Sequence, residues 1–195
     1  MSISEKLIGA VVVLVVAVAV VVSCRGSAST TDYISVLPGL GTEQVQVNMP
    51  ADQLPKSFVG PQKESGVPLH IVSRYSDLAK GVTVVCYEDR VWHATFYLRP
   101  GTWGRKHYSA FPGIVDDAIT YQSSIEDIIA EFGEPSTHES AADSTYLDFG
   151  EKGIEFRFKG DNLQSVTVDD PTFNTDEIYE KIRDYRAKNP KENED

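Results

Sequence analysis

The stretch TYLDFGEKGIEFRFKGDNLQSVTV at residues 145–168 decides the fold of this chain. Within it, the run IEFRF at 154–158 alternates strictly between apolar and charged residues, as a strand with one buried face does. The flanking segments 145–149 and 163–168 are also rich in β-forming residues, and the polar run at 159–162 is typical of a tight turn. We therefore expect an antiparallel meander of three strands.

A short helix is expected just before this meander. Ser123 can cap the helix while Glu126, three residues later, bonds back to the cap backbone. Gly133 and Pro135 would then end it. Its apolar face would consist of Ile125, Ile128, Ile129 and Phe132.

The same unit recurs upstream. Pro38-Gly39-Leu40 is matched 74 residues later by Pro112-Gly113-Ile114, and Lys80-Gly81 is matched 72 residues later by Lys152-Gly153. In this first copy Pro55 falls within the helix region, and proline in a helix interior costs about 3 kcal/mol, so that helix should be broken or very short. Three strands are expected there, at 69–75, 82–87 and 91–98. In the last of them Trp92, Ala94, Phe96 and Leu98 would share one face.

These patterns predict an α+β fold: two tandem copies of a short helix followed by a three-stranded antiparallel meander, plus a C-terminal helix. Asn174 and Glu177 would start that last helix, with an apolar stripe of Ile178, Ile182 and Tyr185. The expected organisation is a signal peptide or membrane anchor at 1–23, a flexible tether at 24–36, a first αβ repeat at 37–98, an inter-repeat linker at 99–111, a second αβ repeat at 112–170, the C-terminal helix at 171–189 and a frayed tail at 190–195.

The N-terminus indicates export. Residues 7–22 are almost entirely aliphatic, but they are shorter than the ~20 residues that a membrane-spanning helix needs. The run ends at Val21-Val22-Ser23-Cys24, which resembles a bacterial lipobox, so Cys24 is the predicted lipidation site. The alternative is an uncleaved anchor helix whose outer end is marked by Arg25. In both interpretations the folded part lies outside the cytoplasm, in the cell envelope.

The net charge and the cysteine content of the chain limit the kinds of partner and cross-link that it can have. The formal net charge of −11 argues against nucleic acid, because binding a phosphate backbone requires clustered positive charge. The membrane would therefore be reached through the N-terminus alone. Apart from Cys24 the chain contains only Cys86, in the β-prone run 82–87, so we expect a buried core thiol and no disulfide. No cofactor is predicted. The histidines are scattered without the spacing of a metal site, and their positions are His70, His93, His107 and His138.

No catalytic residues are predicted. The chain has no nucleophile elbow, phosphate-binding loop or dinucleotide motif. Three acid pairs occur at Asp116-Asp117, Glu126-Asp127 and Asp169-Asp170. Sequence neighbours point to different faces of a strand or helix, which favours solvated surface over a pair of catalytic carboxylates.

The most localised chemical feature is the basic and aromatic segment at 99–108. Its candidate binding residues are Arg99, Trp103, Arg105, Lys106, His107 and Tyr108. Aromatic side chains beside cations suit an acidic partner or a sugar ring. The alternative interpretation is a linker in which Trp103 packs into the core and the cations balance nearby acids.

The pattern S-x-x-E/D-x-I/V-x-x-x-F/L-G-x-P at 123–135, followed by the meander, resembles small bacterial envelope lipoproteins of the SmpA/OmlA type. That resemblance implies a β-lactamase-inhibitor-protein-like fold, with a helical segment on a small antiparallel sheet, and a binding or assembly role. The expected function is thus a membrane-tethered, non-enzymatic module that binds an envelope protein. The alternative is an extracytoplasmic ligand-binding or enzymatic domain that uses the loop at Trp103 and Tyr108.

Overall fold

The structure is a computed structural model that describes residues 34–63, 67, 71–103, 105–173 and 175–189. The predicted signal peptide or anchor, Cys24, most of the tether and the C-terminal tail lie outside the described residues. In the described part of the chain, no helix is both long and apolar enough to cross a membrane.

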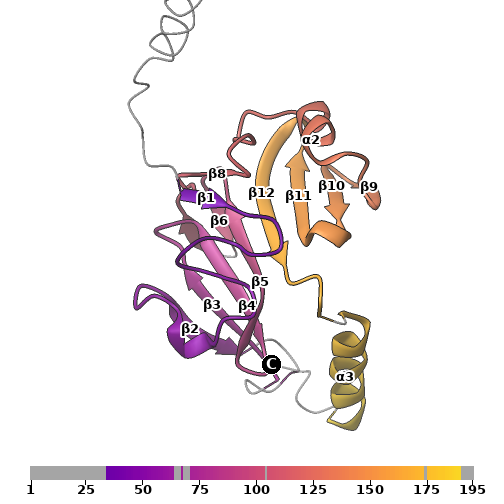
Figure 1. Cartoon of the computed structure of the whole chain (residues 1–195). Coiled ribbons are helices and arrows are strands. Elements are labelled where there is room, and N and C mark those ends of the chain that lie inside the picture. Colours follow the sequence, from indigo (N-terminus) through magenta and orange to yellow (C-terminus); the bar gives the residue numbers. More distant parts are fainter. Residues whose placement is uncertain (1–33, 64–66, 68–70, 104, 174, 190–195) are drawn as a thin grey trace, which may run out of the picture. The chain divides into compact units, whose positions relative to one another are not determined.

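The main element is an eight-stranded antiparallel sheet in the order β2-β3-β4-β5-β12-β11-β10-β9 (Figure 1). Its strands are β2 (Val59–Lys63), β3 (Val72–Asp77), β4 (Val82–Tyr87), β5 (Arg90–Tyr97), β9 (Thr137–Ala141), β10 (Ser144–Phe149), β11 (Ile154–Lys159) and β12 (Asn162–Asp169). Two smaller pairs accompany it, a parallel pair of β1 (Ile34–Val36) with β8 (Gly113–Val115) and a hairpin of β6 (Gly101–Trp103) with β7 (Lys106–Tyr108).

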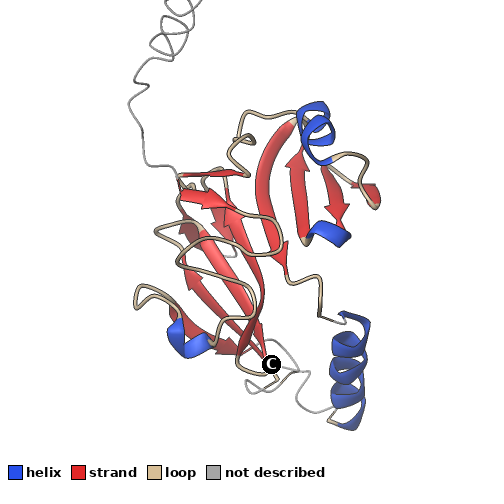
Figure 2. Cartoon of the chain, viewed as in Figure 1, coloured by secondary structure: helices blue, strands red, loops and turns tan. Residues whose placement is uncertain are grey.

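The predicted α+β class is wrong, because strands make up 45% of the described residues. They dominate the architecture (Figure 2). The α-helices of the described residues are α2 (Ile125–Phe132) and α3 (Thr175–Lys188). Where the first repeat should have a helix, the chain forms only the 3-10 turn η1 (Ala51–Gln53), which ends before Pro55. A second 3-10 turn, η2 (Gly150–Lys152), joins β10 to β11. Each half of the sheet also contributes four strands instead of the three predicted.

The two halves of the sheet meet where β5 pairs with β12. Thr95 lies opposite Thr167, 72 residues further along the chain, and their hydroxyls are 3.1 Å apart. The pairing of Val82 with Phe96 recurs, 72 residues on, as the pairing of Ile154 with Val168. The halves are therefore related by a shift of 72 through their strands.

The predicted match of Pro38-Gly39 with Pro112-Gly113 does not correspond to equivalent structure. Gly113 begins β8 and pairs with Ile34, whereas Gly39 adopts a left-handed conformation in the turn that follows β1.

One face of the sheet, called here the α2 face, carries the larger core. Its fully buried side chains include Phe96 of β5, Phe156 of β11 and Val168 of β12. The helix α2 packs on this face through Ile128 and Phe132. Its cap lies one residue later than predicted: the hydroxyl of Ser124, not Ser123, accepts a hydrogen bond from the Asp127 amide at 3.2 Å, and the Asp127 carboxylate accepts one from the Ser124 amide.

The opposite face, called here the α3 face, carries a smaller core under α3. Ile178 and Ile182 of the helix pack against a set of sheet residues that comprises Val72, Val85, Tyr87 and Trp92. Nζ of Lys181 donates a hydrogen bond of 2.8 Å to the Tyr87 hydroxyl. These contacts hold α3 on strands β3 to β5. None of the described residues of β10 to β12 belongs to this smaller core.

A register shift in β5 overturns the predicted position of Trp92. The pairing with β4 slips between Val85 and Cys86, so that Val85 faces His93 while Cys86 faces Val91. A bulge of this kind adds one residue and redirects the side chains around it. Trp92 therefore joins the core under α3, whereas Ala94, Phe96 and Leu98 stay in the core of the α2 face as predicted.

Candidate functional site

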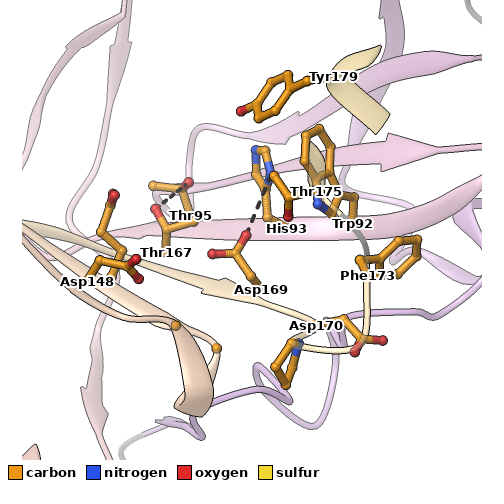
Figure 3. A pocket seen from close by; sticks show the side chains of 14 residues that line it. Trp92, His93, Thr95, Asp148, Thr167, Asp169, Asp170, Phe173, Thr175 and Tyr179 are labelled. Carbon is orange, nitrogen blue, oxygen red and sulfur yellow. Dashed lines mark hydrogen bonds and ion pairs between the residues drawn. The ribbon is translucent and has the colours of Figure 1, made fainter. Parts of the chain in front are cut away.

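A cavity of about 580 Å³ opens on the α3 face, between β5, β10 to β12 and the start of α3 (Figure 3). Polar side chains on strands form its floor, and aromatic side chains form one wall. The lining residues that matter for its chemistry are Trp92, His93, Asp148, Glu155, Asp169 and Tyr179.

Three carboxylates converge on the floor of the cavity from three neighbouring strands. Asp148 of β10 lies directly opposite Glu155 of β11 in the antiparallel register. Asp169 lies at the end of β12, the next strand. Like charges in directly opposed positions destabilise a sheet, so this arrangement works against folding.

The surroundings of the three carboxyl groups disfavour their ionised forms. Burial, followed by the charges of Asp169 and Asp148, raises the pKa of Glu155 to about 7. Burial and the charge of Asp148 raise the pKa of Asp169 to about 6. Burial also raises the pKa of Asp148. Near neutral pH the cavity thus holds acids whose negative charge is poorly compensated.

His93 does not supply the missing positive charge. Its Nδ1 lies 3.7 Å from Oδ1 of Asp169, but burial and the nearby Arg74 lower the pKa of His93 to about 4. At neutral pH the imidazole is therefore neutral and the contact is not an ion pair. Among the described residues that line the cavity there is no Lys or Arg.

The aromatic wall is a consequence of the β5 bulge. The bulge places Trp92 beside His93, with ring centroids 4.9 Å apart. The exposed Tyr179 of α3 meets Trp92 edge to face at a centroid distance of 5.6 Å. Indole and phenol rings attract cations through the negative potential of their faces. Carboxylates below and aromatic rings at the side are both groups that attract cations.

The equivalent positions in the other half of the sheet, 72 residues earlier, show whether the fold requires these acids. Seventy-two residues before Asp148 and Glu155 stand Ser76 and Thr83, which also lie opposite each other but are neutral and buried. The position equivalent to Asp169 is Tyr97. The sheet therefore forms this register without acids, and the carboxylates of the second half are not a requirement of the fold.

The predicted basic segment lies elsewhere, at the β6–β7 hairpin, and none of its residues lines the cavity. Arg99 binds the main chain, donating to the carbonyl oxygens of Leu163 at 3.1 Å and Tyr121 at 3.0 Å. Tyr108 stacks on Tyr97 with centroids 4.1 Å apart. These two candidates thus make structural contacts. The other described side chains of the set are exposed, namely Arg105, Lys106 and His107. The side chain of Trp103 lies outside what the structure describes.

Of the acid pairs assigned to solvated surface, one contributes to the site. Asp169 lines the cavity, and its neighbour Asp170 accepts hydrogen bonds from the amide and hydroxyl of Thr172 at 2.8 and 2.6 Å, in the turn towards α3.

Sequence reasoning missed Asp148 and Glu155 because it looked for acids adjacent in the chain. The signal was present in the predicted hairpin, since pairing 145–149 with 154–158 places these two residues opposite each other.

Cys86 has the environment expected of a core residue. Cys86 is fully buried, as predicted, and burial raises the pKa of its thiol to about 12, so it is not a reactive thiolate. Within the described ranges, no three His, Cys, Asp or Glu side chains are grouped so as to hold a metal ion.

No family model, no curated protein and no solved structure matches this chain. The chemistry of the cavity must therefore be inferred from its own geometry. Two actions fit that geometry: binding of a cation by carboxylates and aromatic rings, and proton transfer by a carboxyl group with a pKa near neutrality.

Proposed function

We propose that this protein is a membrane-tethered, non-enzymatic binding module of the cell envelope, and that its acidic cavity receives a cationic side chain of a protein partner. The observation that carries the proposal is the convergence of Asp148, Glu155 and Asp169 beside Trp92 and Tyr179. Burial and the neighbouring carboxylates raise the pKa values of Glu155 and Asp169, and a lysine or arginine from a partner would favour their ionised forms.

The surroundings of the cavity support a binding role. Its floor lies on strands of one continuous sheet, which hold the carboxylates in fixed positions before any ligand arrives. Buried charges with a defined partner contribute strongly to specificity, whereas exposed surface pairs contribute little. A net charge of −11 would also attract a basic partner over a distance.

Co-purification from membranes tests the proposal. The double variant Asp148→Asn, Glu155→Gln removes two charges while keeping the side-chain shapes. The control Glu131→Gln, Asp161→Asn removes the same charge from two exposed positions outside the cavity. We expect recovery of the cross-linked partner to fall at least tenfold in the cavity variant and to stay unchanged in the control. Equal recovery with both variants would overturn the proposal.

The cation chemistry can be tested directly with small probes. N-acetyl-lysine amide, titrated into isotope-labelled protein, should shift the indole N–H resonance of Trp92 in the nuclear magnetic resonance spectrum. N-acetyl-norleucine amide has a similar stem without the charge and should leave that resonance in place. If both probes act alike, the cavity recognises apolar surface and not charge.

The proposed membrane tether is inferred from the sequence alone. If Cys24 is lipidated, a palmitate analogue fed to cells should label the native protein and the control Cys86→Ala but not Cys24→Ser. Labelling of all three proteins would exclude the lipoprotein route and leave the uncleaved anchor helix.

A hydrolase is the second candidate function, favoured by one specific observation. Glu155 has a pKa of about 7 beside Asp169 with a pKa of about 6, and pairs of acids with raised pKa values serve as general acids and bases. The two hypotheses differ in whether the protein converts a substrate. Hydrolysis of nitrophenyl glycosides by the native protein, lost in Glu155→Gln, would support this second function.

A further inference from the structure

The two edges of the eight-stranded sheet differ in how they could meet another chain. At one edge, β2 contains Pro61, which has no amide hydrogen, and its register with β3 shifts between Val59 and Gln62. Both features are common protections of an edge strand against further pairing. The β2 edge is therefore poorly suited to accept a regular ninth strand.

The other edge strand, β9, has a regular ladder. It lies beside β10 at the edge of the sheet (Figure 1). It pairs with β10 in unbroken register over all five of its residues, from Thr137 to Ala141, and every one of them is exposed. It contains no Pro, Lys or Gly and no bulge. No other strand of the described residues pairs with its outer side. The outward amides and carbonyls of β9 thus form a template for strand addition.

The charge on β9 selects the kind of strand that would add. Glu139 points to the α3 face, because it lies opposite Tyr146, which is two residues before Asp148 on β10 and therefore on the same face. If a second copy paired antiparallel about Glu139, the two carboxylates would be directly opposed, which is unfavourable. The net charge of −11 adds a general repulsion between copies. A basic segment from another protein has neither penalty.

We propose that β9 receives an extended, basic segment of a protein partner as a ninth strand of the sheet. The inference rests on the proposed function and identifies the form in which the partner presents its cation. Main-chain hydrogen bonds along β9 would provide affinity, and side chains that alternate between the two faces would provide specificity.

The added strand connects the edge to the cavity. On the α3 face, Thr137 lies next to Asp148, and Asp148 lies next to Glu155. Strands are about 4.8 Å apart, so the new strand would lie about 10 Å from β10. A lysine placed opposite Thr137 would extend ~6 Å across that threonine, towards Asp148. Glu139 already belongs to this negative region, because its charge contributes to the raised pKa of Glu155. Basic residues at alternate positions of the segment would face Thr137 and Glu139.

Selection from a random peptide library displayed on phage, against the full chain in detergent micelles, tests this inference. We expect the selected peptides to carry Lys or Arg at alternate positions between β-branched residues. Binding of a selected peptide should fall at least tenfold with Glu139→Lys and stay unchanged with the control Glu131→Lys on α2, which is equally exposed. Peptides without basic residues, or no selected peptides at all, would overturn the proposal.

Two proline variants separate strand addition from simple charge attraction. Amides of successive residues in a strand point to opposite sides, so one of Thr137→Pro and His138→Pro removes an outward amide and the other an amide facing β10. Loss of the amide facing β10 breaks a ladder hydrogen bond and lowers the melting temperature, whereas loss of the outward amide does not. The variant with the native melting temperature therefore has the blocked edge, and its affinity for the peptide should fall at least tenfold.

If both proline variants unfold, hydrogen exchange measured by mass spectrometry on the native protein tests strand addition instead. Bound peptide should slow the exchange of residues 137–141 in the native protein. Absence of that protection would overturn strand addition. If a peptide binds without protecting β9 and stops binding in the variant Glu155→Gln, that result would overturn strand addition at β9 and would keep the acidic cavity as the binding site.

Discussion

Replacing Glu155 by glutamine should stabilise the protein at alkaline pH. The carboxyl group of Glu155 lies in the cavity opposite Asp148, and burial together with the neighbouring acids raises its pKa from 4.5 to about 7. A group whose pKa is raised in the folded state binds its proton more tightly there than in the unfolded chain. Its contribution to stability is therefore present at low pH and is lost as the pH rises through the folded-state pKa.

The magnitude follows from the two pKa values. Each pKa unit corresponds to about 1.4 kcal/mol, so the full change from 4.5 to about 7 corresponds to about 3 kcal/mol at pH 8. Because the carboxyl group is partly exposed, solvent screening lowers the expected effect to about 2 to 3 kcal/mol. Glutamine cannot ionise and has nearly the same shape. At pH 4 the variant and the native protein should be about equally stable. At pH 8 the variant should be more stable by about 2 to 3 kcal/mol, or ~5 to 10 °C in melting temperature.

Urea denaturation at pH 4, 6 and 8, followed by circular dichroism, measures this difference. The control Glu131→Gln removes an exposed carboxylate from α2 and should change stability by less than ~0.5 kcal/mol at every pH. Part of the pH dependence should persist in Glu155→Gln, because the pKa of Asp169 is also raised, to about 6. If the native protein and Glu155→Gln had the same stability at pH 8, the assignment of an uncompensated charge to this cavity would be refuted.

Three further predictions concern the scaffold, and chemical denaturation tests each of them. Phe156→Ala should lower the free energy of unfolding by about 3 to 5 kcal/mol, because Phe156 is fully buried and packs against the rings of Phe132 and Phe149 at 5.2 and 5.9 Å. Gly153→Ala should be more harmful than Gly160→Ala, by about 1 kcal/mol or more. Both positions have positive φ, but only at Gly153 would a Cβ collide with the carbonyl oxygen of Asp169. Ser124→Ala should cost about 1 kcal/mol through loss of the α2 cap, and an unchanged stability would place the cap elsewhere.

The local structure of the second half was predictable from sequence because each strand carries its own signal. The alternation at 154–158 and the turn after it correctly predicted β11 and its pairing with β10 and β12. The capping pattern correctly predicted a helix, with an error of one residue, since Ser123 and Ser124 are both followed three residues later by an acid.

The fold class was not predictable in the same way, because it depends on the absence of an α-helix from the first half of the sheet. Pro55 correctly indicated a weak helix, but the prediction still counted it as a structural unit, and only η1 forms. The edge strands β2 and β9 were missed altogether. Both are short, exposed or interrupted, so neither shows the alternation that marks a half-buried strand.

The cavity depends on contacts that sequence periodicity cannot express. The bulge that turns Trp92 onto the α3 face violates the two-residue period on which the prediction relied. Asp169 approaches His93 only because β12 pairs with β5, a pairing between residues far apart in the chain. Local patterns determine which residues alternate along a strand, whereas the register between distant strands determines which side chains meet.

The ionised acids of the cavity weaken the free protein, and a bound cation would recover part of that loss. A cation that restores the pKa of Glu155 from about 7 to 4.5 would recover up to about 3 kcal/mol at pH 8, which corresponds to roughly two orders of magnitude in affinity. Ser76 and Thr83, at the equivalent place in the other half, have no such charge to recover. The opposed carboxylates thus occur at this place in one half of the sheet and not in the other. That asymmetry is expected of a binding module, because a purely structural sheet would gain nothing from opposed carboxylates.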